Sequence, residues 1–405
     1  QFADQNDWQV KNSKYLLSYK ELASILGECL PNASSSVVVE FLTPGLSGAY
    51  ILRADFVHEG TKKERIIKID KNCTLLHREK EAGVLLAELG GAHTHKFIKP
   101  IKSTEVFDWA CLTFNAANET VTLRKYLQDN LSKYNDNELH SILDSVFLEF
   151  YREGAFPHGL DKDKKVSTCV WNGNSENYDG LDFTPLEKAD INRNISTIFN
   201  SIPSKIIDKT GISNRLDSLR LFLAEQKYKD KTISAKAVNV VSCRAHGDFN
   251  SGNILVNKKD GADPRFIDFS NVSKNPTQHA LLDIGKLSVD MEKYVVQDRE
   301  VALGGLDILD WVQCHHDWLA GNSLSTKTEL LKKIYSINTR LLEIANSRME
   351  KFGLNAEETK AQFNMVRLRY LLRTLGHPAL PLEKKVFALC AIFDVLDYLC
   401  GNEYV

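Results

Sequence analysis

The hydrophobic and polar positions of the first part of the chain predict a small sheet with helices around it. Apolar residues recur at helical spacing over residues 18–30, and Pro31 ends that pattern. Runs that alternate, or that are rich in β-branched residues, then predict strands. The predicted strands cover residues 37–42, 49–57, 65–70, 97–103 and 107–114, with a charged turn at 58–64 and a helix at 74–89. The predicted order is three strands, one helix and two strands.

From residue 118 onward the pattern becomes mostly helical. The polar segment 115–118 is the predicted hinge, and residues 153–186 read as an irregular excursion because glycine, proline and asparagine replace periodicity. The predicted helices cover residues 121–130, 139–151, 191–200, 214–226, 306–319, 326–352, 356–375 and 382–399, and two strands with a polar loop occupy 238–269. We therefore predict an α+β chain with an N-lobe at 1–117 and a C-lobe at 118–405.

Composition narrows the class of protein. The 405 residues carry 51 basic and 53 acidic side chains, so the net charge of −2 gives no electrostatic footprint for nucleic acid or an anionic membrane. The longest apolar run, residues 386–393, is too short to span a bilayer. Eight scattered cysteines without a C-x-x-C pair are typical of reduced thiols in a cytoplasmic protein. The first residue, Gln1, indicates a piece of a longer protein.

The most informative segment is A-H-G-D-F-N-S-G-N-I-L-V at residues 245–256, followed by R-F-I-D-F-S at 265–270. Asp248 can position an acceptor hydroxyl and take its proton. Asn253 and Asp268 supply hard oxygen ligands that can hold Mg²⁺ against nucleotide phosphates. The turn between the apolar runs predicts a hairpin that brings loop and strand together. A blander reading, with these polar residues capping turns in an unrelated α/β domain, does not explain the upstream pattern.

H-G-D-x-x-x-x-N-I-L-V with F-I-D-F resembles the aminoglycoside phosphotransferase and choline kinase group, relatives of the protein kinases. The resemblance implies a two-lobed protein-kinase-like α+β fold, with a catalytic loop at 245–256 and a metal loop at 266–270 of the C-lobe. It also implies Mg²⁺ with ATP or GTP as cofactors, catalytic roles for His246, Asp248 and Asn253, and metal binding by Asn253 and Asp268. More narrowly, P-G-L-S-G-A at 44–49 and the insertion before the catalytic loop are similar to the ternary-complex-associated, kinase-like domains of bacterial conflict and signalling proteins.

The resemblance also assigns nucleotide-binding residues in the N-lobe. Small residues between two strands are placed as a phosphate-covering loop would be. Lys68, flanked by isoleucines, fits the lysine that contacts the phosphates, and the next helix should supply its carboxylate partner. We favour Glu81 over Glu79 because Leu85 and Leu89 continue its stripe, whereas Glu79 leads to Gly83. The complete expected set is Gly45, Leu46, Ser47, Gly48, Lys68, Glu81 and the hinge residues Phe114, Asn115 and Ala116.

Two further positions follow from the same resemblance. Asp283 begins the helix after the metal loop and is expected to brace the catalytic loop. Ser270 stands where protein kinases carry the glycine of D-F-G, which puts the mobility of that loop in question but leaves Asp268 its metal role.

The function that these residues predict is Mg²⁺-dependent transfer of a nucleotide γ-phosphoryl group to a hydroxyl of an unidentified small molecule or protein. The competing hypothesis is a catalytically weak or inactive pseudokinase module that binds nucleotide and regulates a fused or associated effector in a bacterial defence or signalling system. Aminoglycosides are not the expected acceptor, because the segments expected to bind the acceptor alternate in charge instead of presenting carboxylates alone.

Other polar and aromatic residues receive ordinary interpretations. Paired histidines without ligand-spaced partners predict surface positions, not a metal site. The arginines 367, 369 and 373 are read as a solvated stripe in preference to an anion-binding edge. The aromatics expected in the core are Trp109, Trp311 and Trp318, the paired histidines are His93, His95, His315 and His316, and the aromatic considered for substrate contact is Trp171.

Overall fold

The chain forms two compact units in the computed structural model. The first comprises the described residues up to Thr120 with those of Arg265–Lys274, and the second comprises the remaining described residues. The expected phosphate-covering loop, Gly45, Leu46, Ser47 and Gly48, and also Trp171, lie outside the described part of the chain. The structure describes residues 9–11, 16–32, 35–42, 49–71, 73–89, 91–151, 167–170, 185–202, 204, 207, 212–225, 227–228, 231–232, 237–272, 278–297, 306–377 and 380–400.

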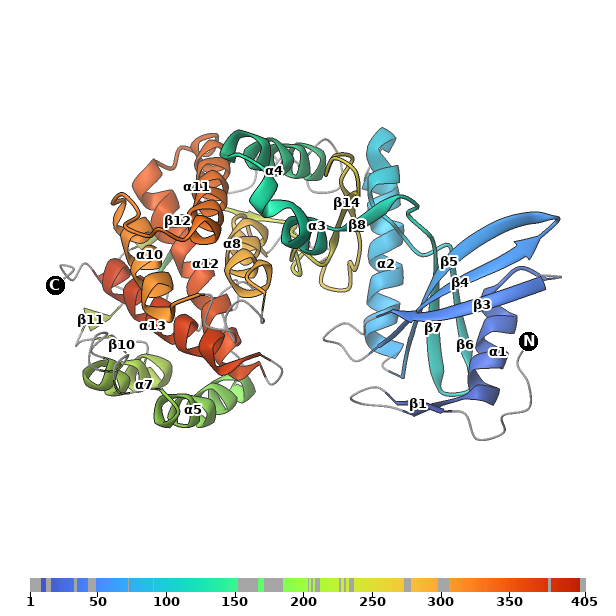
Figure 1. Cartoon of the computed structure of the whole chain (residues 1–405), viewed down its shortest axis with the longest axis horizontal. Coiled ribbons are helices and arrows are strands. Elements are labelled where there is room, and N and C mark those ends of the chain that lie inside the picture. Colours follow the sequence, from blue (N-terminus) through green and yellow to red (C-terminus); the bar gives the residue numbers. More distant parts are fainter. Residues whose placement is uncertain are drawn as a thin grey trace. The chain divides into compact units, whose positions relative to one another are not determined.

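The first unit is built on a five-stranded antiparallel sheet in the order β3-β4-β5-β7-β6 (Figure 1). Its strands are β3 (Ser35–Leu42), β4 (Tyr50–His58), β5 (Thr61–Asp70), β6 (Lys102–Val106) and β7 (Trp109–Asn115). Other elements of the unit are β1 (Gln9–Lys11), β2 (Leu16–Ser18), α1 (Tyr19–Cys29), α2 (Cys73–Leu89), the 3₁₀ turn η1 (Gly91–Lys96) and β15 (Arg265–Phe266). The predicted order of three strands, one helix and two strands is confirmed.

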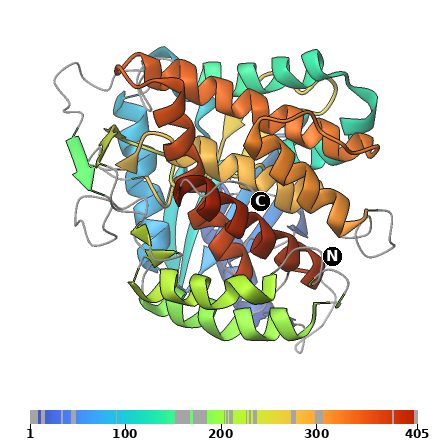
Figure 2. The same cartoon turned by 90° about the vertical axis from the view of Figure 1, so that its left-hand side faces the viewer.

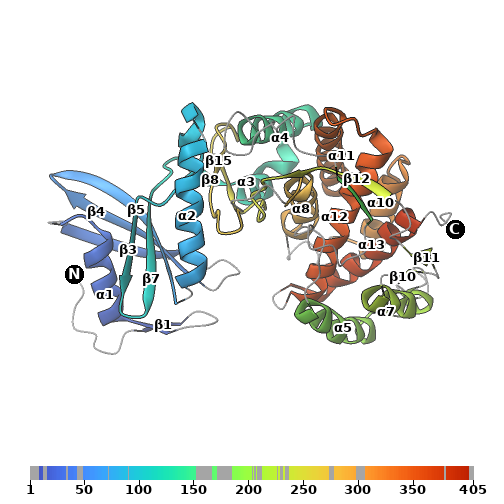
Figure 3. The same cartoon turned by 180° about the vertical axis from the view of Figure 1, so that it is seen from behind.

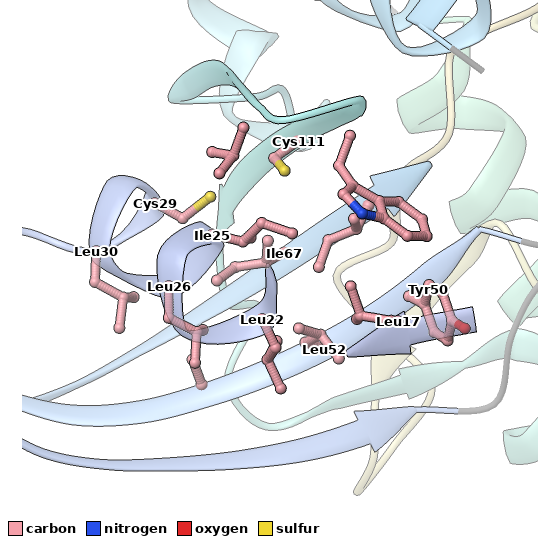
Figure 4. Close-up of a cluster of buried hydrophobic side chains, with 14 of the residues drawn as sticks. Leu17, Leu22, Ile25, Leu26, Cys29, Leu30, Tyr50, Leu52, Ile67 and Cys111 are labelled. Atoms are coloured by element: carbon pink, nitrogen blue, oxygen red, sulfur yellow. The ribbon is translucent and has the colours of Figure 1, made fainter. Parts of the chain in front are cut away.

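The two helices of this unit cover opposite faces of the sheet because side chains alternate along β7 (Figure 3). Trp109 and Cys111 belong to the cluster that contains the apolar side chains of α1. Leu112 and Phe114 instead pack with Leu76 of α2. The α1 cluster, shown in Figure 4, also contains Leu22, Ile25, Leu52 and Ile67. Trp109 is therefore a core residue, as predicted.

Two local predictions were wrong. Strand β5 begins at Thr61 and not after a turn at 58–64, because Glu59 and Gly60 both have positive φ, 50° and 74°, and form a tight turn. The strand predicted at 97–103 begins only at Lys102. Phe97 instead packs its ring on Phe266 and Phe269, at centroid distances of 5.6 and 5.9 Å.

The metal-loop segment was expected with the C-lobe, but it belongs to the first unit. Its contacts explain the difference. Ile98 N donates to Phe266 O at 2.9 Å, beside the aromatic contacts of Phe97. This hydrogen bond and the ring contacts hold the Asp268 segment in the same unit as Lys68.

The second unit is mostly helical. Within it, α12 and α13 pack together, α5 packs against α12, and α8 contacts both α11 and α12 (Figure 2). Most of the predicted helices there agree with the observed ones to within a few residues, although α5 begins at Pro185, six residues before its predicted start, and the α+β class is confirmed. The unit contains α3 (Leu123–Asn130), η2 (Leu131–Lys133), α4 (Asp136–Phe150), α5 (Pro185–Asn200), η3 (Ile212–Arg215), α7 (Leu216–Glu225), α8 (Leu282–Asp290), the π-helical turn η5 (Met291–Val295), α10 (Ile308–Ala320), α11 (Glu329–Glu350), α12 (Ala356–Gly376) and α13 (Leu382–Cys400). Its short strands are β9 (Ser167–Val170), β10 (Lys227–Tyr228), β11 (Lys231–Thr232), β12 (Ala237–Val240), β13 (Ser242–Cys243), β14 (Ile254–Asn257) and β16 (Gln278–His279), while β8 (Thr120–Thr122) begins at the boundary.

The burial of three side chains tests how each was interpreted from the sequence. Arg367 is fully buried on Glu292, at 3.0 Å, so the solvated-stripe reading was wrong for it. His315 is also fully buried, with Nδ1 at 3.1 Å from Asp394 Oδ2, which contradicts a surface position. Trp311 lies in the core as predicted. The seven cysteines whose side chains are described are free thiols, and no helix in the described residues has the length and apolar character needed to cross a bilayer.

The close approach of α8 to α12 depends on Gly285. A Cβ built there would lie 2.6 Å from Val366 Cγ1, too close for ordinary contact. We expect Gly285→Ala to destabilise the protein by about 1–3 kcal/mol, because the buried contact has no room for the methyl group. Gly27→Ala, in α1 with nothing within 4 Å, is the control and should stabilise by roughly 0.5–1 kcal/mol. Chemical denaturation measures both, and equal effects would contradict the tight packing of α8.

Candidate functional site

Lys68 is the centre of the polar group in the first unit. On β5 its neighbours Ile67 and Ile69 belong to the α1 cluster, so alternation directs Lys68 to the α2 face of the sheet. There its Nζ donates to Glu79 Oε2 at 2.7 Å and to Asp268 Oδ1 at 3.1 Å. The Lys68 side chain is 12% exposed, Glu79 2% and Asp268 29%. Asp268 is therefore the solvent-accessible member of a largely buried triad.

The carboxylate partner of Lys68 is Glu79, so the preference for Glu81 was wrong. Among the described positions of α2, the buried ones are Leu76, Glu79, Ala82, Gly83 and Leu86, and Glu79 lies three or four residues from Leu76, Ala82 and Gly83. Glu81 lies on the exposed side of the helix. The sequence preference followed leucines on a neighbouring stripe and missed this one.

The close contacts within the triad shift the pKa values of Lys68 and Glu79. Burial disfavours the charged form of Lys68, but Glu79 and Asp268 more than offset it and raise the pKa of the lysine. Burial raises the pKa of Glu79 to about 7, with Lys68 opposing the rise and Asp268 adding to it. Two carboxylates thus share one ammonium group. A cation held by Asp268 would relieve their repulsion and strengthen the Lys68–Glu79 pair.

Asp268 sits in an unusual backbone conformation, with φ of +62°. Such a conformation is uncommon for a residue other than glycine and is typical of functional sites. Ser270 Oγ donates to Asp268 Oδ1 at 3.1 Å. The serine that replaces the expected glycine therefore orients the aspartate.

In the second unit, the catalytic loop is held at its start by Asp283, as predicted. Asp283 is buried, and its two oxygens accept from His246 N at 2.8 Å and Gly247 N at 3.0 Å. Gly247 has φ of +76°, which favours glycine at this turn. Burial raises the pKa of Asp283, although His246 and the two backbone bonds oppose the rise. The carboxylate fixes the backbone immediately before Asp248.

Asp248 and Asn253 lie together on this loop. Asn253 Nδ2 donates to Asp248 O at 2.8 Å and to Asp248 Oδ2 at 3.1 Å, and the Asp248 side chain is 29% exposed. His246 is fully buried, and its Nδ1 accepts from Asp248 N at 3.3 Å. A buried imidazole that accepts a backbone bond can position the loop, and the catalytic role expected for His246 stays a prediction.

The structure adds a cation that the sequence interpretation missed. Lys286 of α8 forms an ion pair with Asp248 Oδ1, and its Nζ lies 5.1 Å from the centre of the Tyr370 ring. Burial lowers the pKa of Lys286, but attraction by Asp248 outweighs it and the pKa is raised. The candidate base is thus paired with a neighbouring ammonium group.

Asp290, also on α8, holds the other end of the loop. Its Oδ2 accepts from Ser251 N at 2.8 Å and from Ser251 Oγ. Asp283, Lys286 and Asp290 are spaced by three and four residues, so they share one helix face. The sequence signal that could have identified these partners was three charged residues at this spacing in an otherwise mostly apolar helix.

His279, just before α8, is expected to make the stability of the protein depend on pH. Its Nδ1 accepts from Leu281 N at 3.0 Å, and burial lowers its pKa to about 4. The unfolded state therefore binds more protons between about pH 4 and 6.5, and stability should rise with pH across that window, by up to about 3 kcal/mol. We expect His279→Gln to remove this component. Unfolding free energies at pH 4.5 and 7 measure it, and identical slopes in the variant and the wild type would contradict the assignment.

The roles expected for the hinge residues and for the metal ligands remain predictions. Phe114 is buried at the end of β7, Asn115 is exposed and Ala116 is half-buried, which leaves their expected contact with a purine untested. No group of three or more His, Cys, Asp or Glu within the described residues could hold a metal ion. Asp268 and Asn253 each offer an oxygen donor of the kind that Mg²⁺ prefers, and the amide nitrogen of Asn253 is turned to Asp248, but their expected metal role stays a prediction.

Comparison with known proteins finds only distant structural similarity. No protein-family model and no curated protein matches the chain. Among solved structures, one crystal form of a glucosamine kinase is similar at a TM-score of 0.47 with 10% identity, covering 96% of this chain and 86% of that one. A second crystal form gives 0.42 with 9% identity, over 92% and 96%. Spectinomycin phosphotransferase APH(9)-Ia, in complex with ADP and spectinomycin, gives 0.37 with 11% identity, over 94% and 97%. With TM-scores below 0.5, these likenesses assign no activity.

Proposed function

We propose that this protein is a kinase-like phosphotransferase that moves the γ-phosphoryl group of ATP or GTP to a hydroxyl of an acceptor. The observation that carries the proposal is the partly exposed Asp248 carboxylate, fixed by Asn253 on a loop that Asp283 braces. A base in this reaction must be held in place and remain reachable, and both conditions are met.

The other polar residues have matching roles in this proposal. Lys68, held by Glu79, would contact the nucleotide phosphates, and Asp268 and Asn253 would hold Mg²⁺. When bound, Mg²⁺ would neutralise charge on the phosphates. Asp248 would accept the proton of the acceptor hydroxyl at its carboxylate, while Asn253 keeps that carboxylate oriented.

The alternative is a pseudokinase module that binds nucleotide without efficient turnover. The Lys286–Asp248 ion pair favours it, because Lys286 engages Oδ1 and Asn253 engages Oδ2, so both oxygens of the candidate base already have partners. In that case the nucleotide would regulate a fused or associated effector.

Nucleotide consumption tests the two functions. Purified protein is incubated with ATP or GTP, with and without Mg²⁺, and with metabolite fractions from a lysate. Phosphotransferase activity predicts Mg²⁺-dependent consumption that one fraction stimulates. Tight nucleotide binding without consumption in any fraction would contradict it and support the pseudokinase function.

A further inference from the structure

The charged face of α8 continues into the π-helical turn η5, where it ends at Lys293. Lys293 follows Asp290 by three residues, just as Lys286 follows Asp283. The first three residues of this face all have strong polar partners in the protein. Asp290 in particular uses Oδ2 for Ser251 and Oδ1 for Arg124, at 3.3 Å. Its carboxylate is therefore already engaged by other groups.

Lys293 forms no hydrogen bond or ion pair with any residue that the structure describes. Its Nζ lies over the Tyr294 ring, 4.9 Å from the ring centre. The residue is half-buried. Burial, together with Lys286, Arg124 and Lys384, lowers the pKa of Lys293 to about 8, against the opposing attraction of Asp290. The ammonium group is thus held among other cations with too little negative charge to balance them.

The groups around Lys293 explain this imbalance. Arg124 lies over the same ring, with Cζ 3.9 Å from the centre of Tyr294. Lys384 is buried and donates to Val296 O at 2.6 Å. The four cations of this cluster, Arg124, Lys286, Lys293 and Lys384, face three carboxylates, Asp248, Asp283 and Asp290. A partly buried cluster with excess positive charge is unfavourable unless an anion completes it.

We propose that this cluster, which we call the α8 basic cluster, binds an anionic group of the acceptor, a phosphate or a carboxylate. The inference rests on the proposed function and names the acceptor class. Lys286 connects the cluster to Asp248, so an anion on Lys293 and Arg124 belongs to the side of the molecule where the acceptor hydroxyl would meet its base. An acceptor that carries only ammonium groups would be repelled there.

A binding experiment that needs no turnover tests the anion site directly. Inorganic phosphate and acetate are titrated calorimetrically at constant ionic strength set with chloride, which separates a phosphorylated acceptor from a carboxylic one. We expect the wild type to bind one of them with millimolar affinity, and Lys293→Gln to weaken binding about tenfold or more, as expected for loss of a charge-assisted hydrogen bond. Lys327→Gln, an exposed lysine outside the cluster, is the matched control and should bind as the wild type does.

Phosphoryl transfer then tests the acceptor class. Glycerate, glycerol 3-phosphate, glycerol and 3-amino-1,2-propanediol present the same hydroxyl chemistry with different charge. Preference for an anionic compound, with KM raised in Lys293→Gln and kcat little changed, is the expected result. Absence of phosphate and acetate binding, equal binding by Lys293→Gln and Lys327→Gln, or preference for the amine would overturn the proposal. Anion binding at Lys293 without turnover of any compound would instead count against the proposed function alone.

Discussion

Asp248→Asn is expected to lower turnover by about 10²–10⁴-fold while leaving nucleotide affinity nearly unchanged. The asparagine keeps the shape of the side chain and can still meet Asn253 and Lys286, but it cannot accept the proton of the acceptor hydroxyl. The residues proposed for the phosphates, Lys68 and Asp268, belong to the other unit and are untouched. Nucleotide consumption with acceptor measures kcat, and calorimetry measures nucleotide affinity.

The control is Asp260→Asn, in the exposed turn after β14, where the side-chain oxygen that accepts from Ala262 N is preserved. It should leave both quantities unchanged. Because Asp248→Asn also leaves the Lys286 ammonium without its carboxylate, thermal unfolding must show that the variant is folded. Turnover within a few-fold of the wild type in a folded variant would end the assignment of Asp248 as base.

Asp268→Ala should weaken Mg²⁺–nucleotide binding by about 10–100-fold and metal-free nucleotide binding much less, because it removes a charged oxygen ligand. The Lys68–Glu79 ion pair does not depend on Asp268, so the lysine keeps a partner. Calorimetric titrations with and without Mg²⁺ give the two affinities.

Ser270→Ala is the matched control for that variant. It removes the hydroxyl group that orients Asp268 but leaves the carboxylate in place, so its effect should be much smaller. If Asp268→Ala lost the same affinity with and without Mg²⁺, the loss would reflect a defect in folding and not a metal ligand.

Much of the architecture was predictable because local periodicity reports which side of an element is buried. The long helices of the second unit, such as α11 and α13, have apolar stripes over many turns, and their bounds were predicted to within a few residues. The prediction of a strand at 97–103 was wrong because the apolar side chain of Phe97 packs against Phe266 and does not belong to a strand. Short apolar runs carry no information about distant partners.

The candidate site was predictable only where its residues are close in sequence. Asp248 and Asn253 share one loop, and their proximity follows from five residues of spacing. The partners contributed by helices were harder, since the burial of Glu79 and Arg367 depends on Lys68 and Glu292. Glu79 was passed over because a neighbouring stripe of leucines pointed to Glu81, and Arg367 was misplaced because hydropathy treats a charged side chain as solvated.

The spacing of Asp283 and Asp290 places a constraint on α8 that substitutions alone would not reveal. Seven residues separate the two carboxylates, which puts them about 10 Å apart along the helix axis and on the same side of it. One inserted or deleted residue between them would turn one carboxylate by about 100° relative to the other, and both ends of the catalytic loop could not then be held. Variation in chain length should therefore be excluded from α8.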